Sequence, residues 1–157
     1  MSAPLSEGSR VALLVPGSAA YLDAVMSLLA RGILPIPLDP RLTSGERERI
    51  LAHLSPALVV TEEADLAGLT TPGPPGPPRA RPMHVTSGTT GTPKGVDSGL
   101  LADEDARALV AEERELWGFR PDDVNLVLSP LYHSAPPALR DGNPAGRGSG
   151  GDPGPLR

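Results

Sequence analysis

The first part of the chain alternates short apolar runs with longer stretches whose apolar residues recur at helical spacing. The apolar runs cover residues 11–15, 33–36 and 57–60, and each has the length of a buried strand. Between them, residues 18–31 and 43–54 carry apolar side chains every three or four positions, as the buried face of a helix does. Strands that alternate with helices pair in parallel through right-handed crossovers. The pattern therefore predicts an α/β fold.

Particular residues mark the ends of these elements. Ser18 can cap the first helix, and Gly32 stands where a helix-terminating glycine belongs. The second helix starts at Thr43 or the next residue, with the Glu46 carboxylate in its first turn. Pro35 lacks a backbone N–H, so the second strand belongs at an edge of the sheet or ends there.

The pattern changes after residue 70. Proline and glycine dominate residues 71–82, which predicts a loop, because proline removes backbone donors and glycine resists ordering. A helix with an acidic start is predicted over residues 101–117, and a fourth strand over 124–128. From about residue 136 no periodic pattern remains. We expect a partial domain over residues 8–136 and a disordered tail over residues 137–157.

Composition and charge exclude several classes of protein. The chain has 157 residues with 18 glycines, 20 prolines and no cysteine, so disulfides and thiolate-bound metals are excluded. The net charge of −5 argues against general nucleic-acid binding, which needs clustered Lys and Arg. No apolar run approaches a membrane span, and the first residues lack the pattern of a signal peptide. We expect a cytoplasmic protein without a bound metal.

One segment, Thr86-Ser-Gly-Thr-Thr-Gly-Thr-Pro-Lys-Gly95, indicates chemistry. Its three glycines allow the backbone to approach a ligand and to turn several amide N–H groups into one concavity. Its serine and threonines add hydroxyl donors, and Lys94 adds a positive charge. These groups suit a loop that holds a triphosphate.

Other interpretations of this segment fit less well. A P-loop ends in Gly-Lys-Ser/Thr, whereas here Lys94 follows Pro93 and precedes Gly95. The dinucleotide-binding pattern G-x-G-x-x-G is also absent from this segment. A flexible Thr/Gly linker would account for the composition, but not for the particular order of the residues.

The ordered segment resembles the signature of the adenylate-forming family, which includes acyl-CoA synthetases, peptide-synthetase adenylation domains and luciferases. That signature is a Ser/Thr/Gly-rich loop ending in Pro-Lys-Gly, and Thr86–Gly95 matches it throughout. Two further segments are similar to family motifs. They are Pro35-Ile-Pro-Leu-Asp-Pro-Arg-Leu42 and Asp123-Val-Asn-Leu-Val-Leu-Ser-Pro-Leu-Tyr-His-Ser-Ala-Pro136. The resemblance covers residues 8–136 and implies part of the family's large N-terminal domain.

The resemblance implies an ATP-dependent acid–CoA ligase of fatty acid metabolism. A carboxylate attacks the α-phosphate of Mg-ATP, and the CoA thiol then displaces AMP from the acyl-adenylate. His133 matches a motif position beside the acyl pocket, whereas His53 and His84 belong to no recognisable pattern and are expected to be structural or exposed. The residues implied to hold the ATP phosphates are Thr86, Ser87, Gly88, Thr89, Thr90, Gly91, Thr92, Pro93 and Lys94.

Later motifs of the family are missing from the chain. Lys94 is its only lysine, so no second lysine can serve as the catalytic lysine that the family carries in its C-terminal domain. Since catalysis requires the reacting groups to be held together, we expect this chain to be inactive. Two alternatives stay open. One is a fragment of an amino-acid adenylation domain; the other is a non-catalytic remnant that binds nucleotide weakly at most.

The Gly/Pro composition after residue 136 has a genetic interpretation. One extra cytosine in a run at Pro136-Pro137 would shift the reading frame. A permitted codon choice for residues 136–156, read one base over, gives Pro-Leu-Arg-Phe-Ala-Met-Gly-Thr-Leu-Leu-Ala-Gly-Gly-Ala-Ala-Val-Ile-Pro-Gly-Pro-Phe. That string has the helix-then-strand character expected of the family. We therefore interpret the tail as a frameshifted segment, with a native Gly/Pro-rich tail as the alternative.

Overall fold

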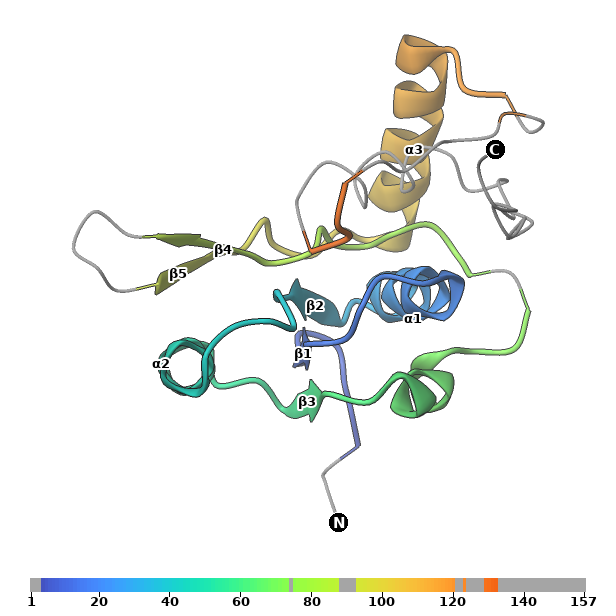
Figure 1. The fold of residues 1–157 in the computed structure, drawn as a ribbon. Coiled ribbons are helices and arrows are strands. Elements are labelled where there is room, and N and C mark those ends of the chain that lie inside the picture. Colours follow the sequence, from blue (N-terminus) through green and yellow to red (C-terminus); the bar gives the residue numbers. More distant parts are fainter. Residues whose placement is uncertain (1–3, 74, 88–92, 121–122, 124–128, 133–157) are drawn as a thin grey trace, which may run out of the picture.

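A three-stranded parallel sheet organises the chain (Figure 1). The computed structural model describes residues 4–73, 75–87, 93–120, 123 and 129–132. Strand β1 (Arg10–Leu13) lies between β2 (Leu34–Pro37) and β3 (Leu58–Val60), and both neighbours pair with it in parallel. The first three of the four predicted strands are therefore confirmed, as is the position of the proline-containing strand at one side of β1.

Two helices connect these strands and cover opposite faces of the sheet. Helix α1 (Ala19–Ala30) joins β1 to β2, and α2 (Ser44–Leu54) joins β2 to β3. Figure 1 shows α1 and α2 on either side of the strands. The geometry follows from the strand order: the two crossovers run in opposite directions across the sheet, so two right-handed connections place their helices on opposite faces. A 3-10 helix, η1 (Glu63–Leu69), packs beside α1.

The caps of both helices are made by the expected residues. The Ser18 hydroxyl accepts a hydrogen bond from the Tyr21 amide, and Gly32 adopts φ +68° after the last turn of α1. At α2, the Thr43 side chain accepts from the Glu46 amide at 3.4 Å. The Glu46 carboxylate accepts from the Thr43 amide at 3.0 Å. This reciprocal arrangement satisfies two amides at the helix start that have no partner within the helix.

The core lies between the sheet and its helices. Val11, Ala12 and Leu13 of β1 are fully buried, because this strand is central and covered on both faces. From α1, the buried residues include Tyr21, Val25, Leu28 and Leu29, which recur at helical spacing in the sequence, and Leu22 on the same helix is partly buried.

The proline-rich segment ends in close contact with the sheet. Its described residues contain no helix or strand, as predicted. However, the Met83 amide donates to the Pro35 carbonyl at 2.8 Å, so the residues that follow this loop run along the outer edge of β2. The Arg79 amide donates to the Leu29 carbonyl at 3.0 Å, which ties the loop to the end of α1.

Helix α3 (Asp103–Trp117) begins two residues later than predicted and forms two ion pairs with the proline-rich segment. Arg79 pairs with Asp103 at 3.0 Å, and Arg81 pairs with Glu113. Among its residues only Ala106 is fully buried, whereas Leu116 and Trp117 are 71% and 68% exposed. The apolar residues at the end of α3 therefore do not join the core.

Several predictions fall on other parts of the chain. The predicted strand at 124–128 and the tail at 137–157 lie outside the described residues, so the proposed domain boundary at residue 136 stays a prediction. Within the described ranges, none of the helices has both the length and the apolarity needed to cross a membrane.

Candidate functional site at the β4–β5 hairpin

The Ser/Thr/Gly segment lies on an antiparallel hairpin. Strand β4 (His84–Ser87) pairs with β5 (Pro93–Val96), and the register places Thr86 opposite Lys94 and Ser87 opposite Pro93. The Thr86 hydroxyl also donates to the Lys94 carbonyl at 3.4 Å. The sequence predicts a loop over the whole of this segment. Instead, its two ends are strands, because backbone pairing satisfies their N–H and C=O groups.

The hairpin brings together the described members of the predicted phosphate site. Thr86 and Lys94 are exposed, so their side chains are accessible to a ligand. The site residues Gly88, Thr89, Thr90, Gly91 and Thr92 lie between the two paired ends, outside the described residues. His133, the predicted acyl-pocket residue, also lies outside them.

Gly95 has a packing role that differs from the predicted one. A Cβ atom built at this position would lie 2.8 Å from Leu54 Cδ2 and 2.8 Å from Met83 Sδ. Leu54 belongs to α2, so the missing side chain allows β5 to approach that helix closely. The third glycine of the motif therefore fixes the base of the hairpin against the helix, whereas the sequence assigned it to ligand approach.

A cleft of about 390 Å³ opens beside the base of the hairpin. Its polar lining comes from Asp39, His84, Thr86 and Tyr132. Its apolar lining includes Leu38, Leu42 and Ile50. Pro37 ends β2, so the cleft lies at the carboxyl end of a parallel strand, where α/β proteins place their ligand sites. The volume falls within the range of small-molecule sites.

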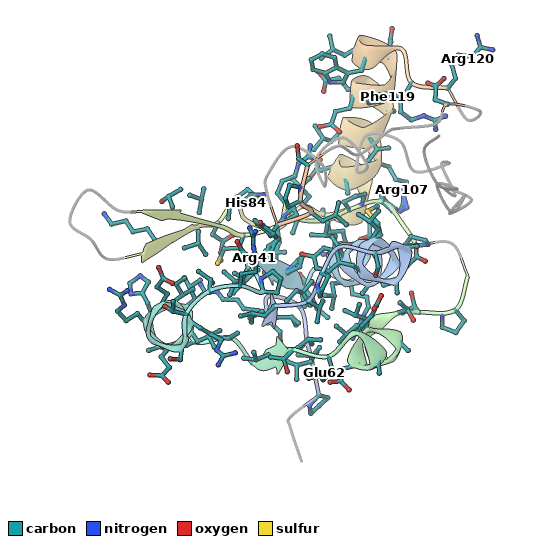
Figure 2. The ribbon with its side chains drawn as sticks, in the orientation of Figure 1. Arg41, Glu62, His84, Arg107, Phe119 and Arg120 are labelled. Carbon is teal, nitrogen blue, oxygen red and sulfur yellow. The ribbon has the colours of Figure 1, made fainter. Side chains whose placement is uncertain are left out.

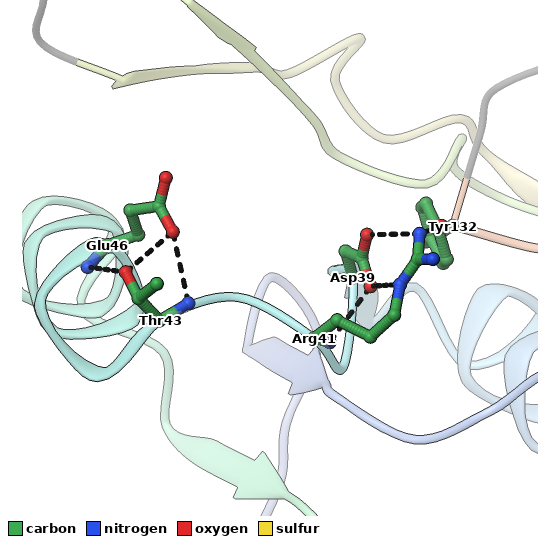
Figure 3. Close-up of polar contacts among 5 residues, drawn as sticks. All are labelled: Asp39, Arg41, Thr43, Glu46 and Tyr132. Atoms are coloured by element: carbon green, nitrogen blue, oxygen red, sulfur yellow. Dashed lines mark hydrogen bonds and ion pairs between the residues drawn. The ribbon is translucent and has the colours of Figure 1, made fainter.

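Two residues of the cleft lining, Asp39 and Tyr132, are joined through Arg41 in a polar network (Figure 3). Arg41 donates through Nε to Asp39 Oδ1 at 3.1 Å and through Nη2 to Asp39 Oδ2 at 2.9 Å. The same Nη2 donates to the Tyr132 hydroxyl at 2.7 Å. Hydrogen bonds from Arg41, and secondarily one from Tyr132, lower the pKa of Asp39 from 3.8 to about 2. Asp39 is therefore ionised at neutral pH.

Sequence reasoning missed most of this site. Asp39 and Arg41 lie within Pro35–Leu42, which resembles a family motif, but no chemistry was assigned to them. His84 was expected to be structural or exposed, whereas it is half-buried and lines the cleft at the start of β4 (Figure 2). His53, in the last turn of α2, is exposed as expected.

The described residues do not assemble a protein cage for a metal ion. Across these ranges no group of three or more His, Asp or Glu side chains converges closely enough to hold one. Magnesium usually binds at such sites through one or two carboxylates, several waters and the phosphates of its substrate.

Comparison with known proteins identifies relatives of this chain by sequence. No family model matches the chain. It is 33% identical to the p-hydroxybenzoic acid–AMP ligase of Mycobacterium tuberculosis, over 82% of the chain and 21% of the ligase. It is also 36% identical to a pyochelin synthetase of Pseudomonas aeruginosa, over 79% of the chain and 8% of that protein. A fumosorinone synthetase of Cordyceps fumosorosea is 32% identical over 83% of the chain and 4% of its own length.

Solved structures share the fold. The long-chain-fatty-acid-CoA ligase of Archaeoglobus fulgidus superposes with a TM-score of 0.58 and 20% identity, over 87% of this chain and 33% of the ligase. The o-succinylbenzoate CoA synthetase of Bacillus subtilis, solved with an acyl-adenylate, gives a TM-score of 0.56 at 21% identity, over 87% of this chain and 41% of the synthetase.

The chain is a homologue of part of an adenylate-forming enzyme. Its α/β arrangement of parallel strands and crossover helices is that of adenylate-forming domains. The chain spans from 4% to 21% of the length of the curated relatives it matches.

Proposed function

We propose that the chain supplies the triphosphate-binding part of an ATP-dependent acid–CoA ligase. The observation that carries this proposal is the pairing of β4 with β5, which sets Thr86 opposite Lys94 and joins the two ends of the Ser/Thr/Gly segment. Hydroxyl and backbone donors complement phosphate oxygens, and a lysine cation attracts them. The exposed Lys94 stands at the end of that segment, where it can meet the β- and γ-phosphates.

In this function, the hairpin assists the departure of pyrophosphate. A carboxylate oxygen attacks the α-phosphorus, and the bond between the α-phosphorus and the bridging oxygen to the β-phosphate breaks. Negative charge then grows on the leaving pyrophosphate, and donors already held in place stabilise it without reorganisation. Mg²⁺ bound to the nucleotide would neutralise part of the same charge. In the second half-reaction the CoA thiol attacks the acyl carbon and AMP leaves.

Two other activities remain candidates. The Mycobacterium tuberculosis relative is named as an acid–AMP ligase, which supports adenylation of an acid as the shared step and leaves the CoA step open. An amino-acid adenylation domain is the other candidate. The resemblance of residues 123–136 to acyl-CoA synthetases favours the acid–CoA ligase. To test whether CoA accepts the acyl group, CoA is supplied and the product is identified as either the thioester or the free adenylate.

Triphosphate binding is tested by removing the lysine. We expect the chain to bind Mg-ATP weakly, and Lys94→Ala to weaken binding by about tenfold, as expected for losing a charged hydrogen-bond donor. Arg107→Ala is the matched control, because Arg107 is an exposed cation on α3 rather than on the hairpin (Figure 2). Calorimetric titration measures both. Equal affinities for Lys94→Ala and the parent chain would contradict the proposal.

Turnover is tested separately from binding. We propose that the 157-residue chain does not complete the reaction, since its single lysine is assigned to phosphate binding and the family uses a second lysine for catalysis. Exchange of labelled pyrophosphate into ATP is measured with fatty, aryl and amino acids. Exchange above background would overturn the proposed inactivity, and the acid that supports it would identify the class of substrate.

A further inference from the structure

Arg41 connects two parts of the chain that are 91 residues apart in the sequence. It follows β2 in the turn before α2, whereas its partner Tyr132 comes after α3. The network links three residues: the same Arg41 guanidinium donates to the Asp39 carboxylate and to the Tyr132 hydroxyl. The Asp39 carboxylate also accepts from the Arg41 backbone amide at 2.9 Å, which fixes the turn itself.

The neighbouring Leu131 makes a second, apolar attachment. This side chain is 7% exposed and lies against Gly17 in the loop after β1. A Cβ atom at Gly17 would lie 2.8 Å from Leu131 Cδ1 and 2.9 Å from its Cγ. Leu131 therefore occupies the space that a side chain at position 17 would need. Gly17 follows β1 and Asp39 follows β2. Residues 131–132 therefore contact the loops that follow the carboxyl ends of two neighbouring strands.

We propose that Arg41 is a positioning residue, which with Asp39 and Gly17 holds residues 131–132 as a latch against the carboxyl end of the sheet. Asp39 and Tyr132 line the cleft beside Thr86, so the latch sets the position of that part of the cleft relative to the hairpin. Arginine suits this task because its planar fork bonds two acceptors at fixed angles, which a lysine ammonium cannot reproduce. The inference that this part of the cleft affects nucleotide binding rests on the proposed function. The inference that Arg41 holds residues 131–132 does not depend on it.

A single thiol tests the latch directly. The chain has no cysteine, so Leu131→Cys creates one buried thiol whose reaction with a thiol reagent reports release of the segment. In this background, Arg41→Lys and Tyr132→Phe should each raise the labelling rate by about threefold to tenfold, which is the effect of losing one ordinary, solvent-exposed hydrogen bond. Arg49→Lys is the matched control. The Arg49 guanidinium donates through Nε to the Gly45 carbonyl of its own helix at 3.2 Å, so the labelling rate of Arg49→Lys should match the background.

Two further measurements separate the latch from other causes. A thiol at Leu28, which is fully buried in α1, should react no faster in Arg41→Lys, since only the latch is released. Because Leu131→Cys could itself release the segment, the second measurement uses the chain without any cysteine. It follows hydrogen exchange of the peptide that contains residues 129–132. There Arg41→Lys and Gly17→Ala should both speed exchange, the latter by displacing Leu131.

The outcomes distinguish the latch from the proposed function. Unchanged labelling and unchanged exchange in Arg41→Lys and Tyr132→Phe would overturn the latch. Equal acceleration at positions 28 and 131 would also overturn it, because it would indicate general destabilisation. If the parent chain binds no Mg-ATP, the proposed function fails while these assays still decide the latch. If it binds, Arg41→Lys should weaken binding by about threefold, and Arg49→Lys should not.

Discussion

Replacing Gly95 with alanine is the sharpest test of how the hairpin is held. The added methyl group would meet Leu54 Cδ2 and Met83 Sδ, both at 2.8 Å. Those two side chains are 4% and 2% exposed, so each is already surrounded by other groups. Carbon atoms in contact normally lie about 3.5–4.0 Å apart, so the neighbours must retreat by roughly 0.7 Å or more.

The loss of stability caused by Gly95→Ala depends on which atoms the added methyl group meets. Inserting a methyl group into a packed site typically destabilises a protein by about 1–3 kcal/mol. Here one contacting atom ends a leucine and the other lies near the end of a methionine, and both side chains can adjust. We therefore expect Gly95→Ala to lower the free energy of unfolding by about 1–2 kcal/mol. The strain should also move β5 away from α2, so Mg-ATP affinity at Lys94 should fall together with stability.

Urea unfolding followed by far-ultraviolet circular dichroism measures this effect. The fluorescence of Trp117 is a poor probe, since that side chain is 68% exposed in the folded state. Gly45→Ala in α2 is the matched control. A Cβ there meets nothing within 4 Å, and the change should stabilise the helix by about 0.5 kcal/mol. In a Met83→Ala background, Gly95→Ala should lower the free energy of unfolding by less, because one of the two contacting side chains is shortened. If Gly95→Ala and the parent unfold at the same urea concentration, the packing argument is wrong.

Three further predictions concern single polar groups. Tyr21→Phe should raise the free energy of unfolding by about 1 kcal/mol in urea titrations, because the buried Tyr21 hydroxyl has no hydrogen-bond partner among the described residues. Thr43→Ala should lower it by about 1 kcal/mol by removing the cap at the start of α2; an unchanged melting curve would exclude that role. Arg41 lowers the pKa of Asp39 from 3.8 to about 2, so the stabilisation from the ionised carboxylate is complete above pH ~4 and disappears as pH falls through ~2. Melting temperatures of Asp39→Asn and the parent should therefore converge at the acid end of that window, and a constant difference would contradict this.

Much of the sheet could be predicted because its signals are local. Apolar runs of strand length and helical repeats of apolar side chains depend on neighbouring residues alone, as do the Ser18 cap and the glycine at position 32. The side position of the strand that contains Pro35 could also be predicted, because proline lacks the donor that an inner strand needs, whereas the order β2-β1-β3 was not predicted. Residues 84–87 and 93–96 escaped this reasoning, because hydroxyl and glycine residues give a weak strand pattern.

What the sequence by itself determined is the order of functional groups in the Ser/Thr/Gly segment and the elements on either side of it. The hydroxyls, the glycines and the one lysine are defined by residue type and spacing, which do not depend on the fold. Only the tertiary structure decided that Gly95 packs against Leu54, that His84 lines a cleft, and that Arg41 reaches Tyr132. Those facts depend on contacts between distant parts of the chain, and no local pattern encodes the distance between two elements once they have packed.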